Sequence, residues 1–193
     1  MISRLRGTLL SRAPGSVEIE TPGGVVYEVE VPLVVMERLP LPGEALELRT
    51  VQVVTETSVS LYGFSEAHER DLFQRLLTAS GVGAKLALSM MSTFHAARLA
   101  RALVEKDIAA LRQIPGVGQK KAEKIALELA DKVAELAIAA PVGGAAPKPA
   151  QEAVRALVAL GFSFSDAELA VREVLEAGGA ESAEELIRRA LAR

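Results

Sequence analysis

Two short stretches of the sequence, residues 80–85 and 115–120, have the residue types needed to bind phosphate groups. Each contains Gly-Val-Gly, and in each a lysine stands two positions after the second glycine. The second stretch lies 35 residues after the first, and Ala87 and Ala122 keep the same offset. We therefore interpret the region as a duplicated unit.

The repeated glycines predict a helix, a tight turn and a second helix in each unit. The first glycine of each pair can adopt the left-handed conformation that ends a helix, where a side chain would clash. The valine is expected to point into the core, and the second glycine to let another backbone come close. The first N–H groups of the next helix have no intrahelical partner and lie at the positive end of its dipole, an arrangement that binds phosphate.

This pattern is that of a helix-hairpin-helix, and its tandem copy resembles modules that bind the DNA backbone without sequence specificity in repair and recombination proteins. The predicted DNA-binding residues are Gly81, Val82, Gly83 and Lys85 in the first unit, and Gly116, Val117, Gly118, Lys120 and Lys121 in the second. We expect the loops to act through their backbone amides, so recognition should depend on backbone shape and not on base sequence. Lys124, one helical turn further on, is interpreted as part of a solvated face. A plain αα-hairpin that needs glycine only to turn is the alternative, and two copies make it less favoured.

Five helices are expected in residues 65–140 to hold these turns. Ser65 is a candidate N-cap for the first helix, which we expect to run to about Ser80. Asp107 is a candidate cap for a short fourth helix. The second, third and fifth helices are predicted at about 85–91, 96–104 and 120–138.

Residues 1–64 alternate short β-rich runs with turn signals such as 21–24 and 40–43. About five strands in so short a segment predict a small barrel, with the OB-fold favoured. An OB-fold that binds single strands would present stacking aromatic residues and basic flanks, whereas this segment has five Lys and Arg against eight Asp and Glu. We therefore interpret it as a scaffold or oligomerisation platform. Glu56 should lie at a hairpin tip, either as a functional acid or as an ordinary solvated turn residue.

The C-terminal part divides into a predicted flexible linker, residues 141–149, and a helical domain, residues 150–193. The linker is rich in Pro, Gly and Ala. The domain predicts three helices, and Ser182 and Glu185 have the spacing of a capping box. Four large apolar residues of this domain could lie either in its core or on its surface: Leu160, Phe162, Leu169 and Leu175.

The distribution of charge along the chain supports nucleic-acid binding by the hairpin region. The 193-residue chain has a formal net charge of −3, but residues 65–135 hold eleven Lys and Arg against nine Asp and Glu. Cationic character is therefore concentrated where the two hairpins are predicted. With no cysteine, no apolar leader and no membrane-length apolar run, the chain is expected to be cytoplasmic, with no disulfide, metal or cofactor.

The order of these segments resembles the RuvA family, the Holliday-junction-binding subunits of bacterial branch-migration complexes. The most specific signals are Tyr62-Gly63-Phe64 followed at once by the two spaced Gly-Val-Gly units. The resemblance covers the full chain and implies an α+β, multidomain fold: an OB-fold barrel, a tandem helix-hairpin-helix domain and a C-terminal three-helix, UBA-like bundle. Two positions depart from the family pattern: Ser3 replaces a glycine, and Thr57 replaces the second of two adjacent acids.

What the resemblance implies for function is specific. The protein would bind four-way junctions as a homotetramer or as an octamer of two tetramers, in homologous recombination, DNA repair and the SOS response to DNA damage. Glu56 would form the acidic pin near the junction centre. Residues 150–193 would dock the RuvB ATPase, and the RuvC resolvase is a further candidate partner.

Two other function classes stay open at this level. A helix-hairpin-helix DNA glycosylase-lyase would use Lys120 as its nucleophile and an aspartate further along the chain, and borohydride trapping of a covalent adduct would reveal it. Here Asp131 lies in the same predicted helix as Lys120, and residues 136–151 contain no carboxylate. The other alternative is a non-catalytic duplex-DNA accessory protein of a nuclease. Since no P-loop, paired-metal carboxylate cluster or catalytic triad is present, we expect a non-catalytic subunit.

Overall fold

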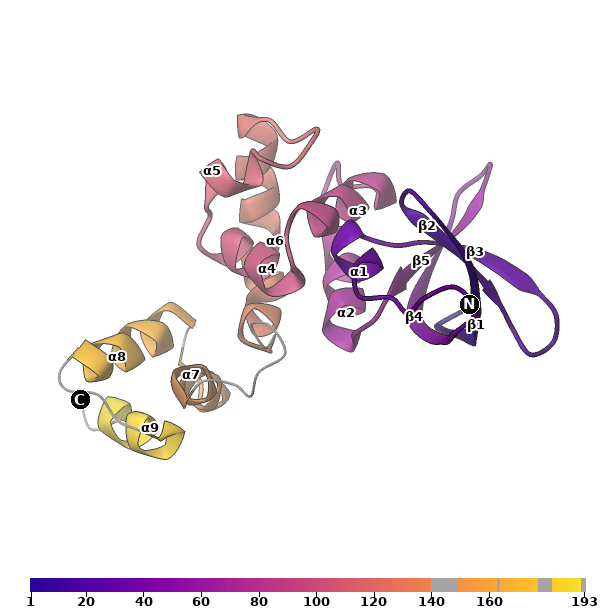
Figure 1. Cartoon of the computed structure of the whole chain (residues 1–193). Coiled ribbons are helices and arrows are strands. Elements are labelled where there is room, and N and C mark those ends of the chain that lie inside the picture. The colour runs from indigo at the N-terminus through magenta and orange to yellow at the C-terminus, as the bar shows by residue number, and fades with distance from the viewer. Residues whose placement is uncertain (140–148, 163, 177–181, 192–193) are drawn as a thin grey trace.

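A computed structural model of the chain describes residues 1–139, 149–162, 164–176 and 182–191 (Figure 1). The N-terminal segment is a closed barrel with strand order β1-β2-β3-β5-β4. The strands are β1 Arg4–Ala13, β2 Ser16–Glu20, β3 Val26–Glu30, β4 Ala45–Val54 and β5 Val59–Phe64. Neighbouring strands are antiparallel except β3 and β5, which run parallel and are registered at Glu30 and Tyr62. The predicted five-stranded barrel is confirmed.

One element of the barrel segment was not expected from the sequence. A short helix, α1, spans Leu33–Met36 between β3 and β4 and buries Val35. Four residues are too few to show a helical period, so only tertiary packing could reveal this helix. It lies against α3, and the backbone N–H of Leu33 donates to Ser92 Oγ at 3.1 Å.

Five helices follow the barrel, as predicted. They are α2 Ala67–Leu76, α3 Ala84–Thr93, α4 Ala96–Val104, α5 Ile108–Leu111 and α6 Gln119–Ala139. Asp107 caps α5 as expected, accepting the Ala110 N–H at 3.0 Å. That hydrogen bond and the nearby Arg98 guanidinium hold the pKa of Asp107 below its usual value.

The predicted bounds of the first helix were wrong at both ends. Its N-cap is Glu66 rather than Ser65, because Glu66 and Glu69 form a reciprocal capping box. It ends at Leu76 rather than near Ser80, because residues 77–80 belong to the turn that follows.

The barrel interior has its own apolar core, and the outer face of the barrel shares a second core with the helices. Tyr62 and Phe64 of β5 pack against Phe73 of α2, with ring centroids 4.9 and 5.0 Å apart. All three aromatic side chains are buried, together with Leu72 and Leu76 on the same face of α2. The outer side of β4 and β5 therefore carries the helical region.

The C-terminal part forms a separate group of three helices, α7 Pro149–Ala159, α8 Phe164–Glu176 and α9 Ala183–Leu191 (Figure 1). They enclose their own small core, which includes Leu157, Val171 and Leu186. Ser182 caps α9, accepting the Glu185 N–H at 3.3 Å. Residues 141–148 of the predicted linker lie outside the described part of the chain. The proposed divisions at 64/65, 140/141 and 149/150 stay predictions. No helix among the described residues is long and apolar enough to cross a membrane.

Candidate nucleic-acid interface

The two Gly-Val-Gly turns have the same backbone structure. Gly81 and Gly116 both have φ of +82°, in the left-handed region that favours glycine. The Val82 N–H donates to Ala79 O at 3.1 Å, and the Val117 N–H donates to the matching Ile114 O at 3.0 Å. The helices on either side also keep the 35-residue offset, with α2 and α5 ending at Leu76 and Leu111 and α3 and α6 beginning at Ala84 and Gln119. The duplication inferred from the sequence is confirmed.

The valine side chain of each turn packs into the apolar core of the helical region. Val82 and Val117 are 4% and 5% exposed and belong to the core of the helical region. Their backbone N–H groups are already used in the hydrogen bonds just described. These two amides hold the shape of the turn, and a contact of Val82 and Val117 with DNA stays a prediction.

The amides presented to solvent lie just after the valines. The first intrahelical bonds of α3 and α6 run from the Ala87 N–H to Gly83 O and from the Ala122 N–H to Gly118 O, both at 2.9 Å. The N–H groups of residues 84–86 and 119–121 therefore precede the regular ladder and lie at the positive helix ends. Each turn thus presents several amides side by side with favourable dipole charge, which suits a phosphate group.

No contact among the described residues requires the second glycine of each turn. A Cβ built on Gly83 or Gly118 would meet no atom within 4 Å, and neither residue has a positive φ. By contrast, a Cβ on Gly7 of β1 would lie 2.0 Å from the carbonyl oxygen of Glu20, and one on Gly63 would lie 2.7 Å from Val29 Cγ1. The close approach of another backbone that the second glycine was predicted to allow is therefore not made by the described part of this chain. Gly83 and Gly118 directly precede α3 and α6, so the open positions adjoin the presented amides.

The predicted lysines surround these turns. Lys85 and Lys120 are exposed in the first turn of α3 and α6, and Lys121 is half-buried next to Lys120. Within the described ranges, none of the three forms an ion pair. Their charge is therefore not neutralised by a neighbouring carboxylate.

A fourth lysine joins the first turn from the second unit. Lys124 Nζ of α6 lies 2.9 Å from Ser80 Oγ, next to Gly81. On the same helix, Glu128 accepts the Ser80 N–H at 2.7 Å, and Lys132 Nζ contacts Thr78 Oγ1 at 3.0 Å. The sequence could not reveal this role for Lys124, because a contact between residues 44 positions apart depends on how the two units pack.

These contacts bring the two turns together. Lys124 lies six residues after Gly118 along α6, which corresponds to about 9 Å along the helix axis. The second turn begins α6, and the first turn rests against α6 about one and a half turns further on. The first turn therefore rests against the same helix that the second turn begins.

Glu56 occupies the tip of the β4–β5 hairpin, as predicted. The Thr55 N–H donates to Ser58 O at 2.8 Å and closes the tip, and Glu56 is exposed. The valines at the base of this tip, Val54 and Val59, face each other across the strand pair and are 66% and 64% exposed. The tip thus combines a single negative charge with an apolar base.

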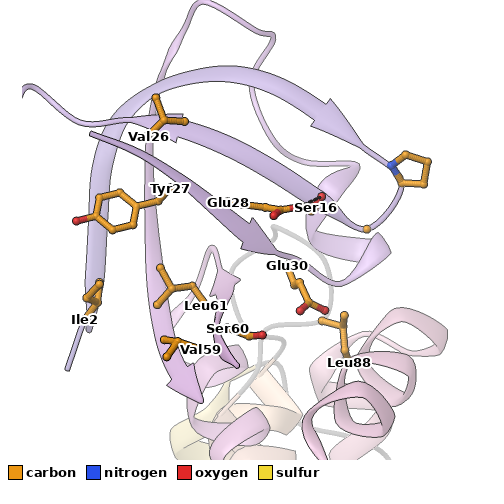
Figure 2. Close-up of a pocket in the computed structure, with 12 residues that line it drawn as sticks. Ile2, Ser16, Val26, Tyr27, Glu28, Glu30, Val59, Ser60, Leu61 and Leu88 are labelled. Atoms are coloured by element: carbon orange, nitrogen blue, oxygen red, sulfur yellow. Dashed lines mark hydrogen bonds between the residues drawn. The ribbon is translucent and has the colours of Figure 1, made fainter. Parts of the chain in front are cut away.

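A groove of about 720 Å³ opens between β3 and β5 below the β1–β2 turn, and Figure 2 shows its lining. Apolar side chains such as Tyr27 and Leu61 line it, together with the carboxylates of Glu28 and Glu30. Burial raises the pKa of the neighbouring Tyr62 above its usual value, and the negative charge of Glu30 raises it further. Two carboxylates and no lysine or arginine make this groove unsuited to phosphate.

The residues needed for the glycosylase-lyase alternative are not brought together. Lys120 and Asp131 lie eleven residues apart in α6, about 16 Å along its axis. A nucleophile and its assisting carboxylate must lie within hydrogen-bonding reach of one reacting group. In the described ranges, no cluster of three or more His, Asp or Glu side chains is placed to hold a metal ion.

The C-terminal helices present apolar side chains to solvent. Leu160, Phe162 and Leu169 are 62%, 40% and 56% exposed. They are therefore not part of the small core of that module. The sequence did not decide between core and surface for these three residues, and the structure places them on the surface. The side chain of Leu175 lies outside the described part of the chain.

Family models match all three parts of the chain. Residues 1–63 match the RuvA N terminal domain, residues 73–131 a SAM-like helix-hairpin-helix tandem, and residues 148–193 the RuvA C-terminal domain. The first two matches coincide with the barrel and with the two turns and their helices.

Full-length relatives show the same similarity. The chain is 48% identical to the Holliday junction branch migration complex subunit RuvA of Gemmatimonas aurantiaca, with 100% of this chain and 98% of the relative covered. It is 44% identical to the protein of that name from Pseudomonas putida, over 99% of this chain and 97% of the relative. The corresponding protein of Pseudomonas aeruginosa is 42% identical, over 99% and 98% of the two chains.

Proposed function

The chain belongs to the RuvA family, and on that premise we propose that it binds four-way DNA junctions through the backbone amides of its two hairpin turns. It holds the junction open for branch migration in homologous recombination and DNA repair. The contacts are made to the sugar-phosphate backbone, so the shape of the DNA and not its sequence is recognised. Chromosomal DNA as the substrate places the protein in the bacterial cytoplasm.

One observation carries this proposal: Gly83 and Gly118 directly precede two helix N-termini, and no described atom lies within 4 Å of a Cβ built on either. Gly23 has the same open space, so it is the combination of that space with helix-end amides that favours the approach of a group from outside the chain. A phosphate oxygen fits that space, since it accepts several N–H groups at once and gains from the helix dipoles. Lys85, Lys120 and Lys121 supply positive charge around it, and Lys124, which is held by Ser80 and paired with Glu128 at 3.8 Å, adds a fixed cation beside the first turn.

Salt dependence tests whether phosphate contacts dominate. In the homotetramer that we propose, two turns per subunit place eight phosphate-binding loops around one junction. If about eight phosphates are neutralised, the logarithm of the association constant should fall with the logarithm of the salt concentration with a slope of about −7. Fluorescence anisotropy of a labelled junction between about 50 and 200 mM NaCl measures that slope. A slope near zero would contradict binding through the backbone.

The exposed Glu56 is proposed as a pin at the junction centre. Four subunits around one junction would bring four such carboxylates close to the phosphates where the strands part. Charge of like sign at short range disfavours some strand paths without adding affinity.

Replacing Glu56 with Lys should therefore tighten binding to a four-way junction while impairing ordered branch migration. Removing one repulsive charge per subunit and adding an attractive one should lower the Kd several-fold at low salt. Junction binding by gel shift and migration of a labelled junction with the motor present measure the two effects. Thr57→Lys, at the neighbouring position without a carboxylate, is the matched control and separates loss of the acid from gain of a cation. If Glu56→Lys binds and migrates like the parent, Glu56 is an ordinary turn acid.

The chain is proposed to have no reaction of its own. Movement of the DNA arms requires an ATPase, and we assign docking of the RuvB ATPase to the C-terminal helices with their exposed Leu160, Phe162 and Leu169. A second tetramer, which would give an octamer, and the RuvC resolvase are further proposed partners of the junction complex.

A further inference from the structure

Glu69 lies at the joint between the barrel and the helical region. It stands in the first turn of α2, and its side chain is 6% exposed. Its Oε2 accepts the Ser65 N–H at 3.1 Å and the Glu66 N–H at 3.0 Å. Ser65 and Glu66 are the whole connection between β5 and α2, so this one carboxylate fixes the path by which the barrel leads into the helices.

The same carboxylate is held from the barrel side by Arg38, which follows α1. Arg38 Nη2 donates to Glu69 Oε1, and Arg38 Nε donates to Val34 O at 3.1 Å. The guanidinium is thus held at one end by the segment inserted between β3 and β4 and at the other end by Glu69 of α2. Since α1 also contacts α3 through the Leu33–Ser92 hydrogen bond, the barrel meets the helices at two polar points.

These polar contacts differ in kind from the apolar ones around them. The packing of Tyr62 and Phe64 on Phe73 holds barrel and helices together, but hydrophobic contact is not directional. A charge-assisted hydrogen bond between a guanidinium and a carboxylate fixes both distance and orientation. The Arg38–Glu69 pair is therefore suited to set the angle between the two parts.

That angle matters because the two proposed DNA contacts lie on different sides of the joint. The tip with Glu56 belongs to the barrel, and both phosphate-binding turns belong to the helices. We propose that Arg38 and Glu69 are positioning residues that hold the tip in register with the hairpin turns, and that they thereby set the preference for a four-way junction over linear duplex. This inference rests on the proposed function of the turns.

The test compares Arg38→Met with Arg6→Met in the full-length protein. Arg6 of β1 forms an ion pair with Glu47 of β4 at 2.7 Å on the barrel surface, so its loss removes the same charge without touching the joint. Binding to a four-way junction and to a linear duplex of equal length is measured for each variant, with donor and acceptor dyes on two junction arms to follow their separation. Arg38→Met should weaken junction binding about tenfold, leave duplex binding unchanged and shift the arm separation. Arg6→Met should change both affinities by the same small factor.

Two further variants separate positioning from folding. Glu69→Gln keeps an oxygen for the two backbone amides but removes the charge that Arg38 meets, and the double variant with Arg38→Met should lose no more preference than either single one. Arg38→Lys keeps the charge without the planar fork and should restore part of the preference. Unfolding midpoints for all variants show whether a loss of affinity follows a loss of fold.

The outcomes distinguish the two claims. If the parent prefers the junction and Arg38→Met prefers it equally, or loses junction and duplex binding in parallel, the positioning role is wrong and the proposed function stands. If the parent binds the two DNAs alike, the proposed function fails, and this inference fails with it.

Discussion

Replacing Gly83 and Gly118 with valine should weaken binding to a four-way junction by at least about 100-fold while leaving the protein folded. Both glycines have a negative φ, and a Cβ built on either meets no described atom within 4 Å, so valine should fit without strain in the backbone. The cost to each helix as an N-cap change is about 1 kcal/mol or less. The added methyl groups would, however, occupy the space into which a phosphate must come to reach the helix amides. Hydrogen bonds to a charged group contribute about 1.5–3 kcal/mol each, so losing several exceeds two factors of ten.

The matched control for this pair is Gly23→Val. Gly23 also has open space around its Cα and a negative φ, but it lies in the β2–β3 turn of the barrel. Its replacement should leave junction binding unchanged.

Gly81→Val and Gly116→Val form an informative contrast, because a φ of +82° strains any valine there and binding should be lost together with stability. Circular dichroism and unfolding midpoints separate the two kinds of loss. A Gly83→Val, Gly118→Val protein that is folded and binds like the parent would show that no phosphate enters these turns.

Deleting residues 141–193 should abolish motor-driven branch migration and change the junction Kd by less than about threefold. The barrel and hairpin helices have a core of their own, and α7–α9 have another, so the deletion removes a unit and not a part of the binding core. Gel shift of the truncated protein and migration of a labelled junction with RuvB and ATP measure the two effects. Loss of junction binding on deletion would contradict the separation of binding from motor recruitment.

A finer version of this experiment keeps the full chain. Leu160→Ser and Leu169→Ser alter leucines that are 62% and 56% exposed, so neither disturbs the small core of the module. Together they should reduce migration strongly if apolar contact recruits the ATPase. Leu127→Ser is the control, because Leu127 is 71% exposed but lies on α6 outside the C-terminal module. If Leu127→Ser reduced migration as strongly, replacing any exposed leucine with serine would have this effect, and docking at the C-terminal helices would be contradicted.

Local sequence predicted the features that depend on local chemistry. The paired glycines identified both turns. A residue in the left-handed conformation at a helix end is usually glycine, so the turn can be recognised from a few neighbouring residues. Asp107 was correctly predicted as a cap for the same reason. Alternating β-rich runs separated by turn residues correctly predicted five strands, and the predicted turns at 21–24 and 40–43 lie before β3 and β4.

The features that the sequence missed all depend on tertiary contact. Lys124 reaches Ser80 only because α6 lies against the first turn. Arg38 and Glu69 are 31 positions apart, and nothing in either local sequence indicates the other. The valine amides of the turns looked free, since the bonds that use them form only when the turn closes. The two turns can therefore be predicted from local sequence, whereas the residues that surround them are known only from the packing of the folded chain.

The competition between two DNAs tests the central claim most directly. A labelled four-way junction is bound by the full-length protein at about 100 mM salt and then challenged with unlabelled junction or with unlabelled linear duplex of the same length and base composition. The account predicts that the junction competes at least about 100-fold more effectively than the duplex, because only crossing arms can occupy the turns of all subunits at once. Equal competition by the two DNAs would contradict the account, since the twin turns would then recognise any duplex backbone.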